Sequence, residues 1–315
     1  TRGIFNNDRT KIGKMIDHKR LISSYATHAL RVFASGMNSG MTNKSSQWFR
    51  VTLDNLAYLE IPGVREALDS LQDTMYAILN HSNIYGVFYS SYEEMGQFGP
   101  ACFLILEDYE DVIRARSFTA GEYFLGTDNK GRVNAFAREF EMTVGQIVRE
   151  FGLESCSDHI KSLFSNKQVD VKITVSHLIV ENYGRDTQKK DFKNMVYRSA
   201  YWETGNDSIG YLAQRGYNRF PVIAPRWDAI STDDVYGYGP GWHSLGAIKE
   251  LQKTRKDKLI VQDKIGNPPV QQDASVVGHS NLLPGGVTKS TSNLPNAGVR
   301  AAYEVPPAID VFLEA

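Results

Sequence analysis

The chain has 315 residues, enough for a sizeable core and for two or more lobes. Its 35 basic and 36 acidic residues give a formal net charge of −1, so the composition lacks the basic excess that a protein gripping nucleic acid tightly usually carries. The sequence has neither an apolar run of about 18 residues nor the apolar core of a signal peptide, and we therefore expect a cytosolic protein or one assembled in a cytosol, with no membrane partner.

The N-terminal third, residues 1–83, is predicted to be mainly helical. Apolar residues recur near the helical period over 8–36 and again over 54–83, where Pro62-Gly63 interrupts the pattern. Residues 35–46 are rich in Gly, Ser, Asn and Thr and are predicted to form a loop.

From Ile84 to residue 225 the period changes to two, which predicts a β-rich lobe. Runs rich in β-branched and aromatic residues, separated by turn residues, predict strands over 86–91, 101–107, 112–118, 123–127, 132–140, 169–181, 196–203 and 209–222. Two short helices are predicted at 143–151 and 157–164, with Thr143 as a candidate N-cap. The pattern favours a small antiparallel barrel or sandwich, and hence an α+β fold.

A long polar helix is predicted to follow a glycine-rich corner. Residues 226–241 contain glycines at positions 237, 239 and 241, and Pro240 suits the first turn of a helix. No proline then intervenes from Trp242 to Ile265, and a Gly-Asn-Pro-Pro stop follows at 266–269. The pattern predicts a rod of roughly 24 residues, about 36 Å long.

The rod is predicted to carry a narrow apolar stripe and a basic face. The stripe, which we expect to pack against neighbours, consists of Trp242, Leu245, Ile248, Leu251 and Leu259. Lys249, Lys253 and Lys256 share another face of the helix. Such a helix is typical of one that packs laterally against neighbouring helices and presents a hydrated, charged face to a binding partner. The alternative is an ordinary surface helix whose lysines are solvated.

No pattern in the chain predicts enzymatic chemistry. Neither a G-x-x-x-x-G-K-[ST] phosphate loop nor a G-x-S-x-G nucleophile elbow occurs, and the three glycines of the corner lack the dinucleotide-binding spacing. Cys156, Asp158 and His159 lie close in sequence but lack a second ligand pair, which is a weak zinc signal. We therefore predict no catalytic, cofactor-binding or metal-binding residues, and interpret the glycine corner as a turn that needs small residues.

The region after the rod, residues 267–306, is rich in turn residues. It includes Pro284-Gly285-Gly286, and apolar residues such as Val276, Leu282 and Val287 are numerous enough for a small hairpin subdomain.

Short motifs spread over residues 20–270 occur in the same order as in a known protein family. They are Ser35-Gly36-Met37, Trp48-Phe49, Gly121-Glu122-Tyr123, Arg138-Glu139-Phe140, Phe151-Gly152, Arg226-Trp227, the run from Val235 to Pro240, and Asn267-Pro268-Pro269. In this order they resemble the head-to-tail connecting (portal) proteins of short-tailed, T7-like bacteriophages.

The resemblance implies a portal fold with a wing, a stem and a clip. Residues 1–83 would form the helical part of the wing, 84–225 its β-rich lobe, 226–241 a connector, 242–266 a stem helix, 267–306 a small α/β clip, and 307–315 the start of a returning stem helix. The family continues well beyond this point, so we expect the C-terminal part of its fold to be absent from this chain.

The resemblance also implies a function without enzymatic activity. A portal is a ring, usually a dodecamer, at one capsid vertex, and it forms a channel through which double-stranded DNA is packaged and ejected. Lys249, Lys253 and Lys256 would touch DNA phosphates without reading sequence. The exposed clip turn would be a docking platform for the terminase and tail; it consists of Leu283, Pro284, Gly285, Gly286, Val287 and Thr288.

The implied partners are further copies of the chain, DNA bound non-specifically, the terminase large subunit, a tail adaptor protein, and the major capsid and scaffolding proteins. No cofactor is implied, and the protein would reside in the virion at the portal vertex after assembly in the host cytoplasm.

Two other classes of protein stay open. Another phage head–tail adaptor or structural protein would lack paired stem helices flanking a clip. A β-rich hydrolase or carbohydrate-binding domain, suggested by the Tyr and Trp content, would need a concave pocket with convergent carboxylates or a metal, and would be a monomer.

Overall fold

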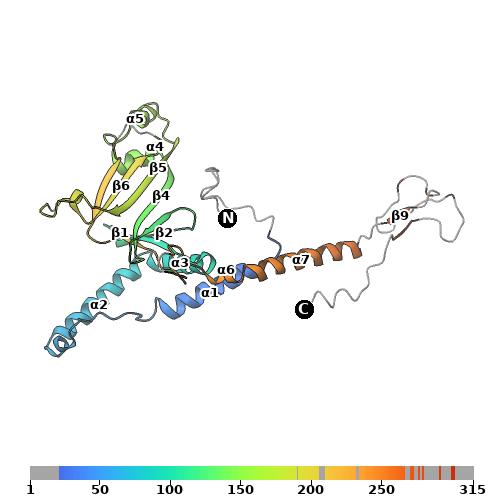
Figure 1. Ribbon diagram of the computed structural model, residues 1–315, viewed down its shortest axis with the longest axis horizontal. Helices are drawn as coiled ribbons and strands as arrows, with labels where there is room; N and C mark the ends of the chain where they lie inside the picture. Colours follow the sequence, from blue (N-terminus) through green and yellow to red (C-terminus); the bar gives the residue numbers. More distant parts are fainter. Residues whose placement is uncertain are drawn as a thin grey trace. The chain divides into compact units, whose positions relative to one another are not determined.

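The computed structural model describes residues 21–189, 191–205, 210–231, 234–266, 270–272, 276, 279, 291 and 299–301. Among these, residues 27–244 form one compact unit, and residues 21–26 together with those from 245 onward form a second. Figure 1 shows the elements of each unit, and the two units are described separately.

The first unit begins with helices, as predicted, but the first of them starts and ends later than the predicted helical stretch over 8–36, of which residues 8–20 lie outside the described residues and 21–24 are not helical. The helical elements are α1 (Tyr25–Met41), the short 3₁₀ helix η3 (Leu56–Glu60), α2 (Val64–His81) and α3 (Ile84–Phe98). The prediction of a loop over 35–46 is wrong for its first half, because α1 continues through Gly36 and Gly40 to Met41. Ala34 is fully buried in a cluster with Tyr92 and Met95, and this packing outweighs the low helix propensity of the glycines.

The strand predicted at 86–91 is also wrong, because these residues lie within the helix α3. Ile84, Val87, Ser91 and Met95 are buried, and their spacing of three or four residues follows the helical period. Most of the other residues of this apolar run are at least partly buried. Because the helix is buried on several sides, its sequence is apolar and rich in aromatic residues, and such a run is easily mistaken for a buried strand.

Two antiparallel sheets make up the β-rich part of the first unit. The smaller has the order β2-β1-β8, formed by β1 (Cys102–Asp108), β2 (Val112–Phe118) and β8 (Val222–Ile223). The larger has the order β3-β4-β5-β6-β7, formed by β3 (Phe124–Thr127), β4 (Val133–Thr143), β5 (Lys172–Glu181), β6 (Tyr197–Glu203) and β7 (Ala213–Tyr217). The α+β class is therefore confirmed.

The two sheets share one core. It contains Leu104 of β1, Phe118 of β2, Phe136 of β4, Ile179 of β5 and Val222 of β8, all buried. Both sheets are open, since β3 and β7 do not pair with each other among the described strands, so a sandwich-like arrangement forms rather than a closed barrel. The single stretch predicted at 209–222 instead supplies β7 to one sheet and β8 to the other.

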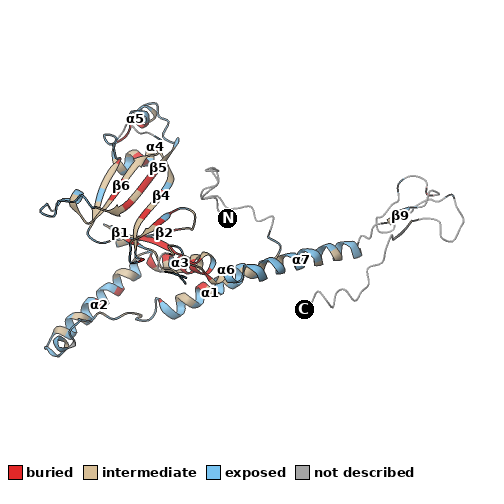
Figure 2. Cartoon of the chain, viewed as in Figure 1, coloured by how far each residue is buried: buried red, intermediate tan, exposed pale blue. Residues whose placement is uncertain are grey.

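A second core lies beneath two short helices, α4 (Val144–Phe151) and α5 (Asp158–Ser165), and it includes Ile147, Ile160 and Val175. The predicted N-cap is confirmed: the Thr143 hydroxyl accepts from the Gln146 N–H at 3.3 Å, and the Gln146 side chain accepts from the Thr143 N–H at 3.0 Å. The 3₁₀ turn η4 (Phe192–Asn194) lies between β5 and β6. Figure 2 shows how the buried residues gather in the sheets and in α3.

The predicted rod is interrupted once, near its beginning. The helix α6 (Pro240–His243) belongs to the first unit, Ser244 follows it, and α7 (Leu245–Gly266) belongs to the second. The Ser244 hydroxyl and the Ser244 N–H both donate to the Pro240 carbonyl oxygen, which closes the α6 turn locally. Trp242, placed on the rod by the sequence, therefore lies on a separate helix.

The second unit contains α7 and the antiparallel pair β9 (Val270–Gln272) and β10 (Val299–Ala301). The returning helix expected at 307–315 lies outside the described residues.

Candidate functional site

The helix α7 is the most exposed long element that the structure describes. None of its residues from 245 to 265 is buried, and most are exposed (Figure 2). Large apolar side chains of α7 are exposed to solvent: Leu245 and Leu251 are 39% exposed, and Leu259 is 50% exposed. Ile248 is partly buried. A helix of this length gains little from packing against the described residues, so its apolar side chains are available to contacts beyond them.

The three candidate lysines of α7 are all exposed. At about 100° per residue, Lys249, Lys253 and Lys256 lie within roughly 60° of one another around the helix axis, whereas Lys258 lies on the far side. The helix has six basic and three acidic residues, so it is locally positive within a nearly neutral chain. This face can attract an anionic surface, and nothing in it provides the fixed hydrogen-bond geometry that base recognition needs.

Trp242 does not take part in this surface. It lies on α6 in the first unit, where its ring centroid is 5.8 Å from that of Tyr238, and it is 59% exposed.

One flank of α7 holds the segment that precedes α1, and both belong to the second unit. The Gln252 side-chain oxygen accepts from the N–H groups of Ile22 and Ser23, each at 3.0 Å. The Gln252 side-chain N–H donates to the Ser23 carbonyl oxygen at 2.7 Å. We call these three hydrogen bonds the Gln252 clamp. Beside it lies an open groove of about 350 Å³, lined by Ile22, Ser23, Ser24, Tyr25, Leu251 and Arg255.

The connector before α6 is fixed to the first unit by main-chain contacts. A Cβ atom on Gly239 would lie 2.4 Å from the Met95 carbonyl oxygen and 2.7 Å from the Gly99 nitrogen. Gly237 has a φ of +68°, and a Cβ there would lie 2.1 Å from the Asp228 carbonyl oxygen. The interpretation of the corner as a turn that needs small residues is therefore confirmed.

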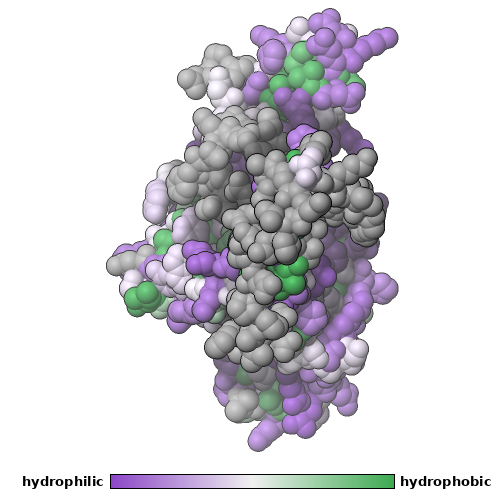
Figure 3. All heavy atoms as spheres, turned by 90° about the vertical axis from the view of Figure 1, so that its right-hand side faces the viewer, coloured by the Kyte–Doolittle hydropathy of each residue, from purple (hydrophilic) through white to green (hydrophobic). Residues whose placement is uncertain are grey.

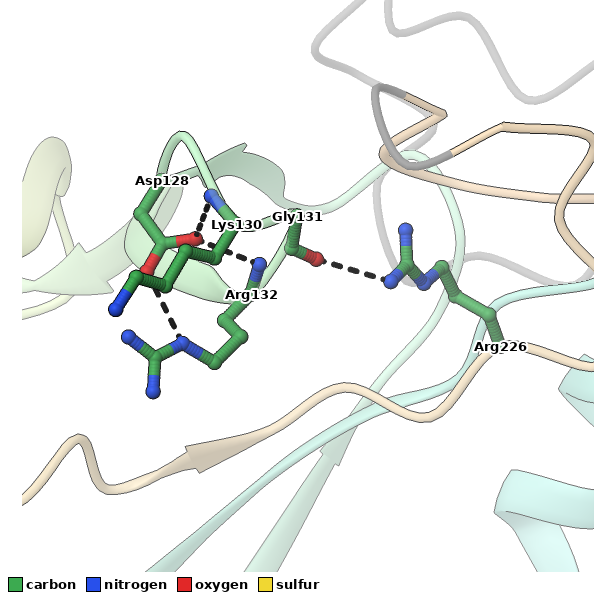
Figure 4. Close-up of polar contacts among 5 residues, drawn as sticks. All are labelled: Asp128, Lys130, Gly131, Arg132 and Arg226. Carbon is green, nitrogen blue, oxygen red and sulfur yellow. Dashed lines mark hydrogen bonds and ion pairs between the residues drawn. The ribbon is translucent and has the colours of Figure 1, made fainter.

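Arg226 ties this connector to the β3–β4 turn, as Figure 4 shows. Its guanidinium group donates to the Gly131 carbonyl oxygen at 3.1 Å and also to the Asp234 carbonyl oxygen. The turn itself is closed by Asp128, whose carboxylate accepts from the N–H groups of Lys130 and Arg132 and pairs with the Arg132 side chain. The neighbouring Trp227 packs its ring 5.2 Å from that of Phe33.

A buried polar cluster crosses three strands of the larger sheet. Arg138, His177 and Tyr201 are cross-strand neighbours on β4, β5 and β6. The Arg138 Nε donates to His177 Nδ1 at 3.3 Å, and the imidazole stacks on Tyr201 with 3.9 Å between ring centroids. Burial, followed by the charge of Arg138, lowers the pKa of His177 to about 2. The ring is therefore neutral, and its Nε2–H donates to the Ser199 hydroxyl at 3.0 Å.

This Ser–His pair is a structural feature rather than a nucleophile with its base. Ser199 is 0% exposed and His177 is 1% exposed, so no substrate reaches the hydroxyl. Burial also lowers the pKa of Arg138, to about 10, which leaves the guanidinium charged at neutral pH.

The sequence cluster at Cys156, Asp158 and His159 does not form a metal site. The Cys156 thiol is buried and donates to the Gly152 carbonyl oxygen at 3.1 Å, while Asp158 pairs with Lys161 at 3.9 Å. Across the described ranges, no group of three potential metal ligands comes together, and no described helix is long and apolar enough to cross a membrane.

The six candidate docking residues of the clip, Leu283 to Thr288, lie outside the described residues. Among the described ones, the sequence missed both the Gln252 clamp and the Arg138 cluster. A signal for the second was present, because Phe136 and Phe140 alternate with Arg138 and share its face of the strand. No local pattern points to the clamp, since its partners are 229 and 230 residues apart.

Comparisons with known proteins agree with the resemblance found in the sequence. The family model for the bacteriophage head to tail connecting protein matches residues 1–315. The probable portal protein of Bordetella phage BPP-1 is 38% identical over 302 residues, covering 96% of this chain and 54% of that protein. The portal protein of Salmonella phage epsilon15 is 36% identical over 290 residues, covering 91% of this chain and 52% of that protein. The chain thus spans about half the length of the curated relatives it matches.

Proposed function

This chain belongs to the family of bacteriophage head-to-tail connecting proteins, and on that premise we propose that it is part of a portal subunit. Copies of the subunit form a ring at one capsid vertex, and the ring is the channel through which double-stranded DNA is packaged and ejected. The role is structural rather than enzymatic.

The observation that carries this proposal is the exposure of α7. Leu245, Leu251 and Leu259 are each more than a third exposed on a helix without a buried residue from 245 to 265. In a ring with cyclic symmetry, every copy offers one flank to the preceding copy and another to the following one, so the apolar stripe of one helix can be buried against a neighbouring copy. We propose these residues, together with Ile248, as stem-packing contacts.

The lysine face supports a channel for DNA. Lys249, Lys253 and Lys256 are exposed and share one side of α7. Mobile lysine side chains attract phosphates without fixing a register, as a channel for sliding DNA requires. A chain with a net charge of −1 binds DNA weakly overall, which also suits passage rather than retention.

The remaining parts take their roles from the same premise. We propose 1–83 and 84–225 as the two parts of the wing, 267–306 as the clip and 307–315 as the start of the returning stem helix. The sequence placed the connector at 226–241 and the stem at 242–266; because α6 belongs to the first unit, we propose 226–244 as the connector and 245–266 as the stem. The clip turn at 283–288 docks the terminase large subunit and the tail adaptor, the wing meets the major capsid and scaffolding proteins, and the assembled ring resides in the virion after assembly in the host cytoplasm.

Charge reversal of single lysines in the full-length protein tests the channel. We expect Lys253→Glu to assemble normally and to lower the amount of DNA packaged several-fold in a packaging reaction, because it places negative charge beside the phosphates. Lys258→Glu is the matched control, since it makes the same change on the far side of the same helix. Equal packaging by both variants and the unaltered protein contradicts the assignment of the lysine face.

A further inference from the structure

Two arginines from different sheets approach the same pair of aromatic rings. The Arg138 Cζ atom on β4 lies 4.8 Å from the ring centroid of Phe118 and 4.1 Å from that of Phe140. The Arg116 Cζ atom on β2 lies 5.7 Å and 5.8 Å from the same two centroids. Each such contact is attractive, but it leaves both positive charges in place.

Neither arginine has a carboxylate within ion-pair distance among the described residues. In the part of the chain that the structure describes, no ion pair within 4.0 Å involves Arg116 or Arg138, and the Arg116 side chain donates no hydrogen bond. Glu122 favours the charged form of Arg138 from a distance, while its own carboxylate accepts from the Thr119 N–H at 3.3 Å. The third cation near the cluster, Arg215, is already paired with Glu150 at 3.2 Å.

Arg132 shows the ordinary arrangement of an arginine beside a carboxylate, since it pairs with Asp128 at 3.1 Å. Arg114, two residues before Arg116 on the same strand, lies near Asp108, whose pKa is lowered first by the N–H groups of Glu110 and Asp111 and to a lesser extent by the charge of Arg114. Arg116 instead faces a second arginine, and Arg138 is only 6% exposed. Hydrogen bonds to His177 Nδ1 and to the Tyr201 side chain offset part of the cost of burying this charge, but both partners are neutral, and an anion would further stabilise two like charges held so close together.

We propose that Arg116 and Arg138 form a binding site for an oxyanion, namely a phosphate or carboxylate group, between the two sheets. A guanidinium group presents paired N–H donors that match both kinds of group. Arg116 is exposed and gives access from solvent, Arg138 supplies the inner charge, and the rings of Phe118 and Phe140 form the walls. The oxyanion is either a free ion or an acidic side chain of a second copy of the chain, and the chemistry of recognition is the same.

The first experiment uses free ions and does not rest on the proposed portal function. Thermal unfolding of the full-length protein is followed at constant ionic strength in chloride, in inorganic phosphate and in acetate. We expect phosphate or acetate to raise the Tm by about 2 °C or more relative to chloride when the site is saturated. Arg116→Gln is expected to remove this rise. Arg114→Gln, the matched control on the same strand, is expected to keep it.

The second experiment distinguishes the two sources of the oxyanion. If an acidic side chain of another copy fills the site, the free ions raise the Tm of dissociated subunits only, and Arg116→Gln raises the protein concentration needed for assembly at least tenfold. If a free ion fills it, the rise also occurs in the assembled protein, and Arg116→Gln assembles normally. The proposal is overturned if neither ion raises the Tm of either form while Arg116→Gln assembles like the unaltered protein, or if Arg114→Gln removes the rise as completely as Arg116→Gln.

Discussion

At the scale of single residues, His177 shows how burial and hydrogen bonding fix one protonation state. Its Nδ1 accepts from Arg138, its Nε2–H donates to Ser199, and its ring lies against Tyr201. A proton added to Nδ1 would displace the Arg138 donor and place a second charge in the same desolvated space, so the folded protein holds this imidazole neutral.

The folded state therefore loses stability in acid through His177. The pKa of this residue is about 2 when folded and near 6.5 when unfolded, so between these values the unfolded chain binds the extra proton. The free energy of unfolding should fall as the pH decreases below about 6.5, by up to ~1.4 kcal/mol per pH unit from this group. Urea denaturation between about pH 4.5 and 7.5 measures the slope.

His177→Gln keeps an acceptor for Arg138 and removes the titration, so we expect a smaller slope for this variant. His159→Gln, which alters an exposed histidine, is the control and should keep the slope of the unaltered protein. An unchanged slope in His177→Gln shows that this residue does not hold the depressed pKa.

Gly239 is a second residue whose environment dictates its identity. An added Cβ meets main-chain atoms of Met95 and Gly99, and main chain cannot yield as a flexible side chain does. We expect Gly239→Ala to lower the free energy of unfolding by about 1–3 kcal/mol. Gly86→Ala is the matched control: its Cβ meets nothing within 4 Å on a helix, so a gain of about 0.5–1 kcal/mol is expected. Equal effects of the two changes in urea denaturation contradict the close approach.

At the scale of elements, the Gln252 clamp gives the residues before α1 a fixed place on α7. Three hydrogen bonds from one side chain occupy the N–H groups of Ile22 and Ser23 and the Ser23 carbonyl. The same groups in an unattached chain end would exchange freely with solvent.

Gln252→Ala should release this segment and leave α7 helical, because alanine is the better helix former. We expect amide hydrogen exchange at Ile22 and Ser23 to become at least tenfold faster, as measured by mass spectrometry of the corresponding peptide. Gln262→Ala, an exposed glutamine on the same helix, should leave that exchange unchanged. Exchange as slow in Gln252→Ala as in the unaltered protein means that the clamp does not protect these amides.

The elements also show what the sequence can and cannot predict. The strand β2 was predicted with its observed bounds, and the Thr143 cap was found, because alternation and capping are local patterns. The helix α3 was missed because Val87, Phe88 and Tyr89 favour a strand locally, while tertiary burial on several sides selects the helix. Ser244 interrupts the predicted rod near its beginning, because its own hydroxyl closes the α6 turn, and a helical period does not reveal this competition.

Of the candidate site, the sequence predicts the lysine face of α7 but not the contacts between residues that are distant in the chain. The lysine face of α7 follows from spacing alone, and its exposure agrees with that spacing. The Gln252 clamp and the Arg116–Arg138 pair join residues distant in the chain, so no local pattern specifies them.

At the scale of the whole molecule, the chain divides between a packed unit and a long exposed helix. Most of the buried apolar residues that the structure describes lie in the sheets and in α3, whereas Leu251, Leu259 and Ile265 on α7 remain 39% to 50% exposed. On the side of the molecule that Figure 3 shows, the described side chains are mostly hydrophilic and the apolar ones stand in small separate patches. Scattered apolar contacts of this kind suit repeated neighbour-to-neighbour packing in a ring.

The mass of the particle formed by the full-length protein tests the central claim most directly. Native mass spectrometry, supported by negative-stain images, should give a multiple of the subunit mass, with twelve copies as the number that the family resemblance implies, and images of rings with a central hole. Leu259→Asp should weaken or abolish the ring while the subunit stays folded, because Leu259 is 50% exposed before assembly. A full-length protein that remains a monomer at every concentration contradicts the portal assignment.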